Sequence, residues 1–217
     1  MLLNLRYIKP AYKLNIKGIL HIGAHTAEER DLYRDLSISN VSWFEGNPEI
    51  FDNLCKIIDN YEGNKAFNYL LTNEPREYDF YIMNHDQSSS IFPLGLHKKF
   101  YPNIKLKKKI RLQGYRLDDV IAKEKINLKN YNMLCLDVQG AELNVLQGVT
   151  DRLEKFEYIY TEINTIQLYK FGALMDELDI FLKLYGFDRE IWSSTTKGWG
   201  DALYINKKAK HSLHSKE

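Results

Sequence analysis

Short apolar runs alternate with amphipathic segments along most of the chain. The runs end at Gly, Asn or Asp and are typical of strands, whereas the segments between them repeat apolar positions at helical spacing. The predicted strands are residues 18–23, 41–45, 65–71, 78–83, 105–112, 132–138, 157–163, 188–192 and 202–205. The predicted helices are residues 27–36, 48–59, 117–122, 141–147 and 173–185. Strands that alternate with helices predict an α/β fold with a mostly parallel sheet and helices on both faces.

Three of the predicted strands are apolar on consecutive positions, namely GILHIG, NMLCLDV and YIYTEI. Such runs are typical of central strands that are buried on both faces of a sheet. Residues 73–116 interrupt the alternation with two strands around a long loop, and we interpret them as an insertion that covers one end of the sheet. We therefore expect a single domain over residues 1–206 and a flexible C-terminal tail over residues 207–217.

Composition narrows the class of protein. The chain has 217 residues, of which 44% are apolar and 13% aromatic, so it can build a full core. The formal net charge of +1 gives no overall attraction to nucleic acid or to an anionic membrane. Cys55 and Cys135 lie in apolar segments and predict reduced core thiols. The chain shows no long apolar run, so we expect a cytoplasmic protein without a signal peptide or a membrane span.

The turn after the first predicted strand carries candidate chemistry. It has one glycine, Gly23, where a dinucleotide-binding loop has three. Thr26 and Glu29 fit a capping box for the following helix, and Glu28 adds another acid to its first turn. These carboxylates suit the helix dipole but would repel a pyrophosphate. The turn therefore favours a cationic or zwitterionic ligand over NAD.

Three acids lie at the ends of predicted strands: Glu45, Asp137 and Glu162. Because the carboxyl ends of parallel strands meet at one edge of a sheet, we expect these side chains to line a common ligand site. Glu45 follows Gly23 by about twenty residues, the place from which an acid binds both hydroxyls of a ribose. As alternatives, Glu45 could cap the following helix, and Asp137 or Glu162 could cap a helix or pair with a lysine.

Several blocks in order resemble the FkbM family of S-adenosylmethionine-dependent methyltransferases. They are ILHIGAHTAEE, VSWFEGNPEIFDNL, YRLDDV, LCLDVQGAELNVLQGV, YIYTEIN and WGDALYIN, and they span about residues 16–206. The resemblance implies a seven-stranded Rossmann-like class I methyltransferase fold whose last strand is antiparallel. It also implies S-adenosylmethionine as the methyl donor and a hydroxyl of a sugar or polyketide-like small molecule as the acceptor.

The resemblance also assigns residues to the donor. Gly23, His25 and Thr26 would form the donor loop, Glu45 would bind the ribose, and Asp137 would lie near the methionine end and the transferred methyl group. Two positions depart from the family pattern. His21 stands where the first strand of the family usually ends on an acid, which changes how the donor's ammonium is bound, and Ala27 replaces a later glycine of the loop.

The acceptor is expected at the loop NHDQSSSIF, which is similar to a polar loop that the family places near its active site. This assigns Ser89 and Ser90 to acceptor binding. Methyl transfer to a hydroxyl requires a general base within hydrogen-bonding reach. The candidates are Glu162, Asp137, His85 and His25, and we favour Glu162 because it lies at the end of a rigid strand.

Other partners are alternatives to a small hydroxylated acceptor. The basic strip, residues 105–116, could bind nucleic acid, although a lysine-rich edge strand that prevents aggregation is commoner. An acceptor with a phosphate, such as a nucleotide-linked sugar, is a further option, and so is a methyltransferase-like domain without activity. Asp137 and Glu162 could hold a divalent cation, but we do not favour a metal. The sequence leaves the oligomeric state open.

Overall fold

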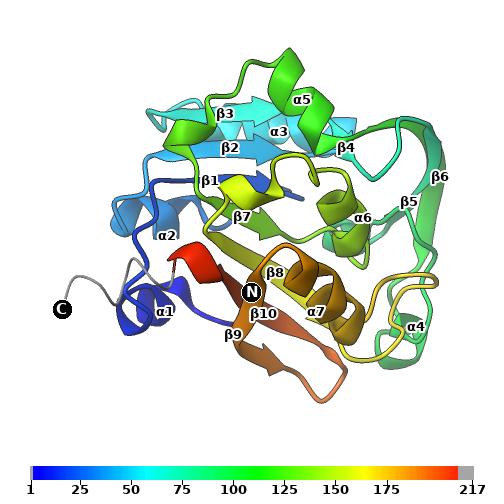
Figure 1. Ribbon diagram of the computed structural model, residues 1–217. Helices are drawn as coiled ribbons and strands as arrows, with labels where there is room; N and C mark the ends of the chain where they lie inside the picture. Colours follow the sequence, from blue (N-terminus) through cyan, green and yellow to red (C-terminus); the bar gives the residue numbers. More distant parts are fainter. Residues whose placement is uncertain (1, 210–217) are drawn as a thin grey trace.

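The computed structural model describes residues 2–209 and has a seven-stranded central sheet (Figure 1). Its strand order is β3-β2-β1-β7-β8-β10-β9. The first five strands of this order are parallel, and β10 is antiparallel to both β8 and β9. The strands are β1 Gly18–Ile22, β2 Asn40–Phe44, β3 Asn64–Phe67, β7 Met133–Leu136, β8 Tyr158–Asn164, β9 Phe187–Ser194 and β10 Trp199–Asn206. This topology confirms the predicted Rossmann-like class I methyltransferase fold.

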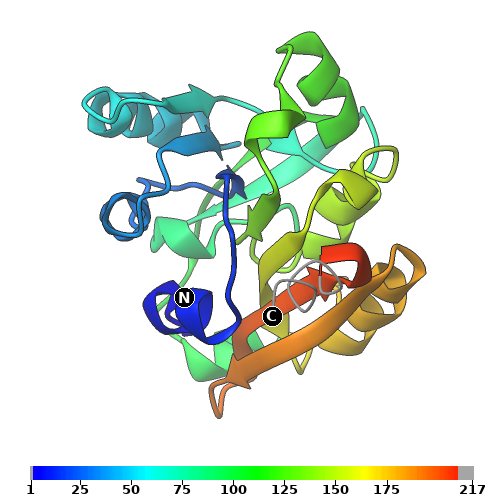
Figure 2. The same cartoon turned by 60° about the vertical axis from the view of Figure 1, so that its left-hand side comes forward.

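Helices cover both faces of the sheet, as the rotated view shows (Figure 2). One layer contains α1 Leu5–Ala11, α2 Arg30–Asp35 and α3 Pro48–Ile58, and the other contains α5 Leu117–Lys123, α6 Glu142–Gln147 and α7 Met175–Leu184. Each layer buries its own core. Alternate residues of β1 contribute to each core, because Ile19 packs with the first layer and Leu20 with the second.

The insertion, together with the short strand that precedes it, forms a second, three-stranded sheet at the carboxyl ends of the central strands (Figure 1). Its strands are β4 Leu70–Leu71, β5 Glu77–Met83 and β6 Leu106–Tyr115, in the order β4-β6-β5. A 3-10 turn, η1 Asp86–Ser88, and the short helix α4 His97–Phe100 lie in the connection between β5 and β6. Two further 3-10 turns, η2 Leu128–Asn130 and η3 Leu153–Lys155, precede β7 and β8.

Several predicted boundaries were wrong. The predicted strand 65–71 is divided between β3 and β4, which belong to different sheets, and the Asn68 amide between them donates to the carbonyl of Glu45 at 2.8 Å. The predicted capping box does not form: α2 begins only at Arg30, the Thr26 hydroxyl donates to Glu28, and Glu29 makes no side-chain capping bond.

Both ends of the described chain add helical structure that the pattern did not predict. Asn4 caps α1, whose Leu5 and Ile8 are buried against the first helical layer. Residues 207–209, where we expected the tail to begin, are helical, and Ala209 is buried. Residues 210–217 of the predicted tail lie outside the described residues. No helix within residues 2–209 is long and apolar enough to cross a membrane.

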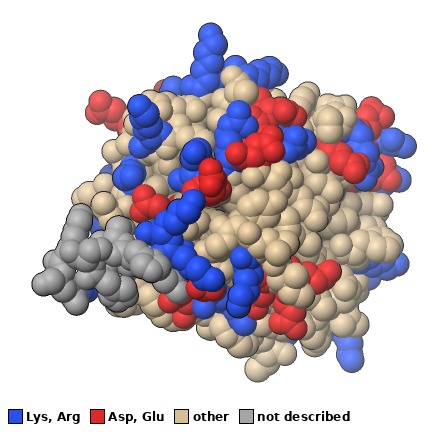
Figure 3. Space-filling model, viewed as in Figure 1, with Lys and Arg blue, Asp and Glu red and all other residues tan. Residues whose placement is uncertain are grey.

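The basic strip lies mostly in β6, and acidic neighbours neutralise much of it. Lys109 pairs with Asp79 of β5 at 3.1 Å, and Arg111 pairs with the same carboxylate at 3.2 Å. Lys108 forms an ion pair with Glu49 of α3. Basic and acidic side chains are interspersed over the visible face of the molecule (Figure 3). These pairs leave little free positive charge on β6 for a nucleic-acid backbone.

Candidate functional site

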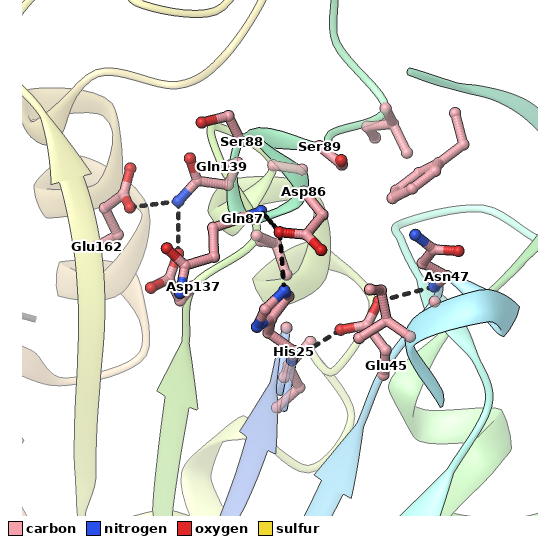
Figure 4. Close-up of a pocket in the computed structure, with 18 of the residues that line it drawn as sticks. His25, Glu45, Asn47, Asp86, Gln87, Ser88, Ser89, Asp137, Gln139 and Glu162 are labelled. Atoms are coloured by element: carbon pink, nitrogen blue, oxygen red, sulfur yellow. Dashed lines mark hydrogen bonds and ion pairs between the residues drawn. The ribbon is translucent and has the colours of Figure 1, made fainter. Parts of the chain in front are cut away.

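A cavity of about 570 Å³ opens at the carboxyl ends of β1, β2, β7 and β8 (Figure 4). The insertion closes it from the other side with residues of η1, α4 and their flanking loops. All three acids that the sequence placed at strand ends, Glu45, Asp137 and Glu162, line this cavity. The three acids therefore lie together at one cavity, as expected for the ends of parallel strands.

The turn after β1 is held tightly against β7. Gly23 has a φ of 80°, which side-chain-bearing residues rarely adopt, and a Cβ placed there would lie 1.9 Å from the carbonyl oxygen of Asp137. The backbone N–H groups of Gly23 and Ala24 both donate to the carbonyl of Phe44, at 2.9 and 3.0 Å. A glycine is thus required for the turn after β1 to pass between β2 and β7.

Glu45 fixes the same loop through its carboxylate. One oxygen accepts from the backbone N–H of His25 at 2.8 Å, and the other accepts from that of Asn47 at 2.7 Å. Asn47 in turn caps α3. Burial raises the pKa of Glu45, and the two backbone hydrogen bonds oppose that shift. Each oxygen keeps acceptor capacity, so the carboxylate can still bind two hydroxyls.

His25 joins the turn after β1 to the insertion. Its Nδ1 lies 2.5 Å from Glu28, and its Nε2 lies 3.2 Å from Asp86 of η1. Gln87 adds a second link, because its amide donates to the Glu28 carboxylate at 3.2 Å. The hydrogen bond to Glu28 raises the pKa of His25 to about 9, so the imidazole is positively charged at neutral pH. We call the contacts among His25, Glu28, Asp86 and Gln87 the latch.

Gln139, which the sequence analysis did not single out, lies between two of the acids (Figure 4). Its amide nitrogen donates to Asp137 and to Glu162, at 2.7 Å each. Its amide oxygen accepts from the Tyr169 hydroxyl at 2.5 Å. Burial, and then the negative charge of Asp137, raise the pKa of Glu162 well above its usual range. A cation beside these groups would favour their ionised form.

The sequence did not assign two more acids to the site, because they stand in ordinary helix-start positions. Burial raises the pKa of Glu29 to about 7, and its carboxylate lies 4.0 Å from His21. Burial also raises the pKa of Glu142 to about 7, and its carboxylate accepts from the N–H groups of Val138 and Gly140. Glu29 lines the cavity, and no lysine or arginine does among the described residues. The cavity therefore suits a cationic ligand.

Of the five remaining residues that the sequence assigned to the site, three line the cavity and two do not. His21 lines the cavity, but its ring is buried, stacks on Trp43 at 4.9 Å and contacts the Tyr33 hydroxyl at 3.1 Å. Burial lowers the pKa of His21 to about 4, so it is neutral at physiological pH. His85 and Ser89 line the cavity.

Thr26 and Ser90 do not line the cavity. Ser90 is buried and donates to the carbonyl of Gln139 at 2.8 Å. Within residues 2–209, no group of three or more His, Cys, Asp and Glu side chains is arranged to hold a metal ion. Asp137 and Glu162 instead share the Gln139 amide.

Solved structures with a similar fold include methyltransferases. An S-adenosylmethionine-dependent methyltransferase from Aquifex aeolicus superposes with a TM-score of 0.53 over 94% of this chain and 90% of that one, at 6% identity. TrmK from M. capricolum, in complex with S-adenosylhomocysteine, superposes with a TM-score of 0.51 over 95% of this chain and 70% of that one, at 12% identity. At these identities the likeness concerns the fold alone.

Sequence comparison identifies a relative with higher identity. The 2-O-methyltransferase NoeI of Sinorhizobium fredii is 31% identical over 127 residues, which are 57% of this chain and 49% of that protein. The chain thus spans about half the length of that relative. The family model of the methyltransferase FkbM domain matches residues 21–189, from the end of β1 into β9. The chain belongs to the FkbM methyltransferase family.

Proposed function

We propose that the protein is an S-adenosylmethionine-dependent methyltransferase that methylates a hydroxyl group of a small molecule. The observation that carries this proposal is the cavity at the carboxyl ends of the parallel strands, which is rich in carboxylates and has no lysine or arginine among its described lining residues. A dinucleotide would bring phosphates into this negative field, whereas S-adenosylmethionine brings an ammonium and a sulfonium. The FkbM family membership supports the same donor.

The donor side of the site extends from β1 to β7. Gly23 and His25 form the donor loop, and Glu45 binds the two ribose hydroxyls with the acceptor capacity that its backbone contacts leave free. Asp137 and Glu29 face the methionine end, where no lysine or arginine among the described lining residues neutralises Glu29, and this favours an ammonium partner. Glu29 thereby supplies the carboxylate for the ammonium that the family usually places at the end of the first strand, where this chain has His21.

The acceptor side holds the general base. S-adenosylmethionine supplies a methyl group on a sulfonium, and the protein aligns an acceptor oxygen with it. We assign Glu162 the removal of the hydroxyl proton, because its carboxylate lies at the end of β8 and is held by the Gln139 amide. His85 is the second candidate, since it lines the cavity from the exposed edge of the insertion. The oxygen acceptor agrees with the name of the Sinorhizobium relative, a 2-O-methyltransferase.

Methyl transfer itself tests the proposal. The purified protein is incubated with S-adenosylmethionine and a panel of hydroxylated small molecules, and S-adenosylhomocysteine formation and the mass of each product are measured. We expect at least one product that is heavier by one methyl group, together with equimolar S-adenosylhomocysteine. Transfer only to RNA or DNA would support the nucleic-acid alternative. Binding of the donor with no transfer to any acceptor would indicate a ligand-binding domain and would contradict the proposal.

A further inference from the structure

Aromatic side chains form one wall of the same cavity, next to the Gln139 cluster. His97 of α4, Tyr101, Tyr169 and Trp199 all line the cavity. The ring centroid of His97 lies 4.8 Å from that of Tyr101 and 5.6 Å from that of Tyr169. The indole of Trp199 donates to the Tyr101 hydroxyl at 2.8 Å. We call these four residues the aromatic wall.

Backbone contacts fix the aromatic wall in place, although its residues come from three distant segments. Two N–H groups at the start of α4, those of Gly95 and His97, donate to the carbonyl of Leu168, at 2.7 and 3.2 Å. Leu94 and Tyr169 form an isolated antiparallel bridge. The Tyr169 hydroxyl then connects the wall to Gln139, and through it to Asp137 and Glu162. A molecule on the wall would therefore lie beside the proposed general base.

His97 carries an unsatisfied polar atom in this wall. The residue is only 6% exposed, and its Nδ1 atom is buried with no hydrogen-bond partner among the described residues. Burial, and then the charge of His85, lower the pKa of His97, so the ring is neutral at physiological pH. A neutral imidazole offers one donor and one acceptor. A buried polar side chain without a partner at the edge of a cavity indicates a ligand that can hydrogen-bond to it.

The charges around the cavity indicate that this ligand carries no phosphate group. Glu28, Glu45, Asp86, Asp137 and Glu162 line the cavity, and no lysine or arginine among the described residues does. Lys197, the cation that lies 4.2 Å from the ring centroid of Tyr101, is not a lining residue. Glu28 and Asp86 already pair with His25, which is cationic and lines the cavity. A phosphate in the cavity would therefore meet carboxylates and no lysine or arginine among the described lining residues.

We propose that the aromatic wall binds the methyl acceptor, and that the acceptor is an uncharged hydroxylated ring, such as a neutral sugar, and not a phosphorylated or nucleotide-linked one. Aromatic faces pack against the apolar C–H face of such a ring, and His97 hydrogen-bonds to a hydroxyl next to the one that reacts. This inference rests on the proposed function, because it names the acceptor class of the same site. It also decides between the neutral and the nucleotide-linked sugars that the sequence left open.

Binding in the presence of saturating S-adenosylhomocysteine tests the acceptor class. Calorimetry compares methyl glycosides of common hexoses with the corresponding hexose 1-phosphates and uridine diphosphate hexoses, and simple phenols serve as uncharged aromatic rings. We expect at least one glycoside to bind at least about tenfold more tightly than its phosphorylated forms. Equal or tighter binding of the phosphorylated forms would overturn the inference, as would binding of phenols alone or of no compound in the panel.

Substitutions test the wall itself. With the glycoside that binds, Trp199→Phe, which removes the indole N–H, and His97→Phe, which keeps a ring and removes the nitrogens, should each raise the acceptor KM about tenfold while kcat changes less than about threefold. Trp192→Phe on β9 is the matched control, because Trp192 is exposed and outside the cavity, and it should leave KM unchanged. Thermal melts establish that each variant is folded.

The results separate this inference from the proposed function. An unchanged acceptor KM in both folded wall variants would show that the acceptor binds elsewhere. If the wild-type protein binds no S-adenosylhomocysteine, the proposed function fails. If it binds S-adenosylhomocysteine and methylates only phosphorylated sugars, the proposed function stands and this inference fails.

Discussion

The donor side and the aromatic wall are two halves of one cavity that hold their side chains in different ways. On the donor side, Glu45 and Gly23 are fixed by backbone hydrogen bonds within neighbouring loops of the central sheet. In the aromatic wall, His97, Tyr169 and Trp199 are brought together from the insertion, the segment after β8 and the start of β10. The donor side is built from local backbone geometry, and the acceptor side from long-range contacts.

This difference distinguishes the part of the cavity that the central sheet fixes from the part that the insertion and the loops can vary. The strand ends and the turn after β1 belong to the framework of the central sheet. A donor site built from them therefore changes little when the surrounding loops change. The aromatic wall depends on an insertion and two loops, which is where specificity can change without altering the sheet. We therefore expect substitutions on the donor side to affect folding and donor affinity together. Substitutions in the wall should affect the acceptor alone.

The largest effect is expected at Gly23. Gly23→Ala would combine a left-handed backbone conformation with a clash against Asp137, so we expect a loss of about 2 to 5 kcal/mol in the free energy of unfolding, and loss of donor binding. Urea denaturation measures it. Gly186→Ala is the matched control: Gly186 has a φ of 82° but no atom nearer than 4.0 Å to a new Cβ, so it should lose only about 1 to 2 kcal/mol. Equal losses at the two sites would contradict the tight donor loop.

The next effect separates binding from chemistry. Glu162→Gln keeps the shape of the side chain, so we expect donor affinity to stay nearly intact while turnover falls by about a hundredfold, the scale of a lost general base. Asp137→Asn should lower both donor affinity and turnover, because its carboxylate faces the donor. Calorimetry and single-turnover rates distinguish the two variants once melts show that both are folded. Full turnover in Glu162→Gln would make His85 the next candidate base.

A smaller effect is expected at Glu45. Glu45→Ala removes the acceptor of the ribose hydroxyls and of two backbone N–H groups, so donor affinity should fall by about 1 to 3 kcal/mol. Glu45→Gln, which keeps one carbonyl oxygen, should lose less. Calorimetry with S-adenosylhomocysteine measures both. An unchanged affinity in folded Glu45→Ala protein would mean that the ribose is bound elsewhere.

The smallest effect concerns the latch. The pKa of His25 rises from 6.5 to about 9 in the folded protein, so its charge contributes stability that is fully present below pH 6.5 and is lost as the pH rises to about 9. The pair is partly exposed, so we expect about 0.5 to 1 kcal/mol. His25→Gln should remove this pH dependence of the unfolding free energy between pH 6.5 and 9. The same slope in the variant and the wild type would assign it to other groups.

The contrast between the halves also explains how far the sequence could predict the molecule. Apolar strand patterns predicted the sheet, and the meeting of parallel strand ends predicted that Glu45, Asp137 and Glu162 lie together. The prediction of a capping box at Thr26 and Glu29, which rested on their spacing alone, was wrong. The turn uses the Thr26 hydroxyl for Glu28 instead, and Ala27 adopts a left-handed conformation before α2 begins.

The sequence could not reveal the aromatic wall. His97, Tyr169 and Trp199 are far apart in the chain and share no spacing pattern, and their proximity depends on how the insertion folds back over β8 and β10. Gln139 is different, because it stands inside the most specific family block, two residues after Asp137. A polar side chain between two strand-end acids was a signal that could have been read as a link between them.

The central claim is that the acid-lined cavity binds S-adenosylmethionine, and calorimetry of the wild-type protein tests it most directly. S-adenosylmethionine and S-adenosylhomocysteine should each bind measurably at one site per chain. NAD should bind at least about tenfold more weakly, a difference of about 1.4 kcal/mol, because its pyrophosphate would meet Glu28, Glu29 and Asp137. Equal affinities for S-adenosylmethionine and NAD, or tighter binding of NAD, would contradict the claim.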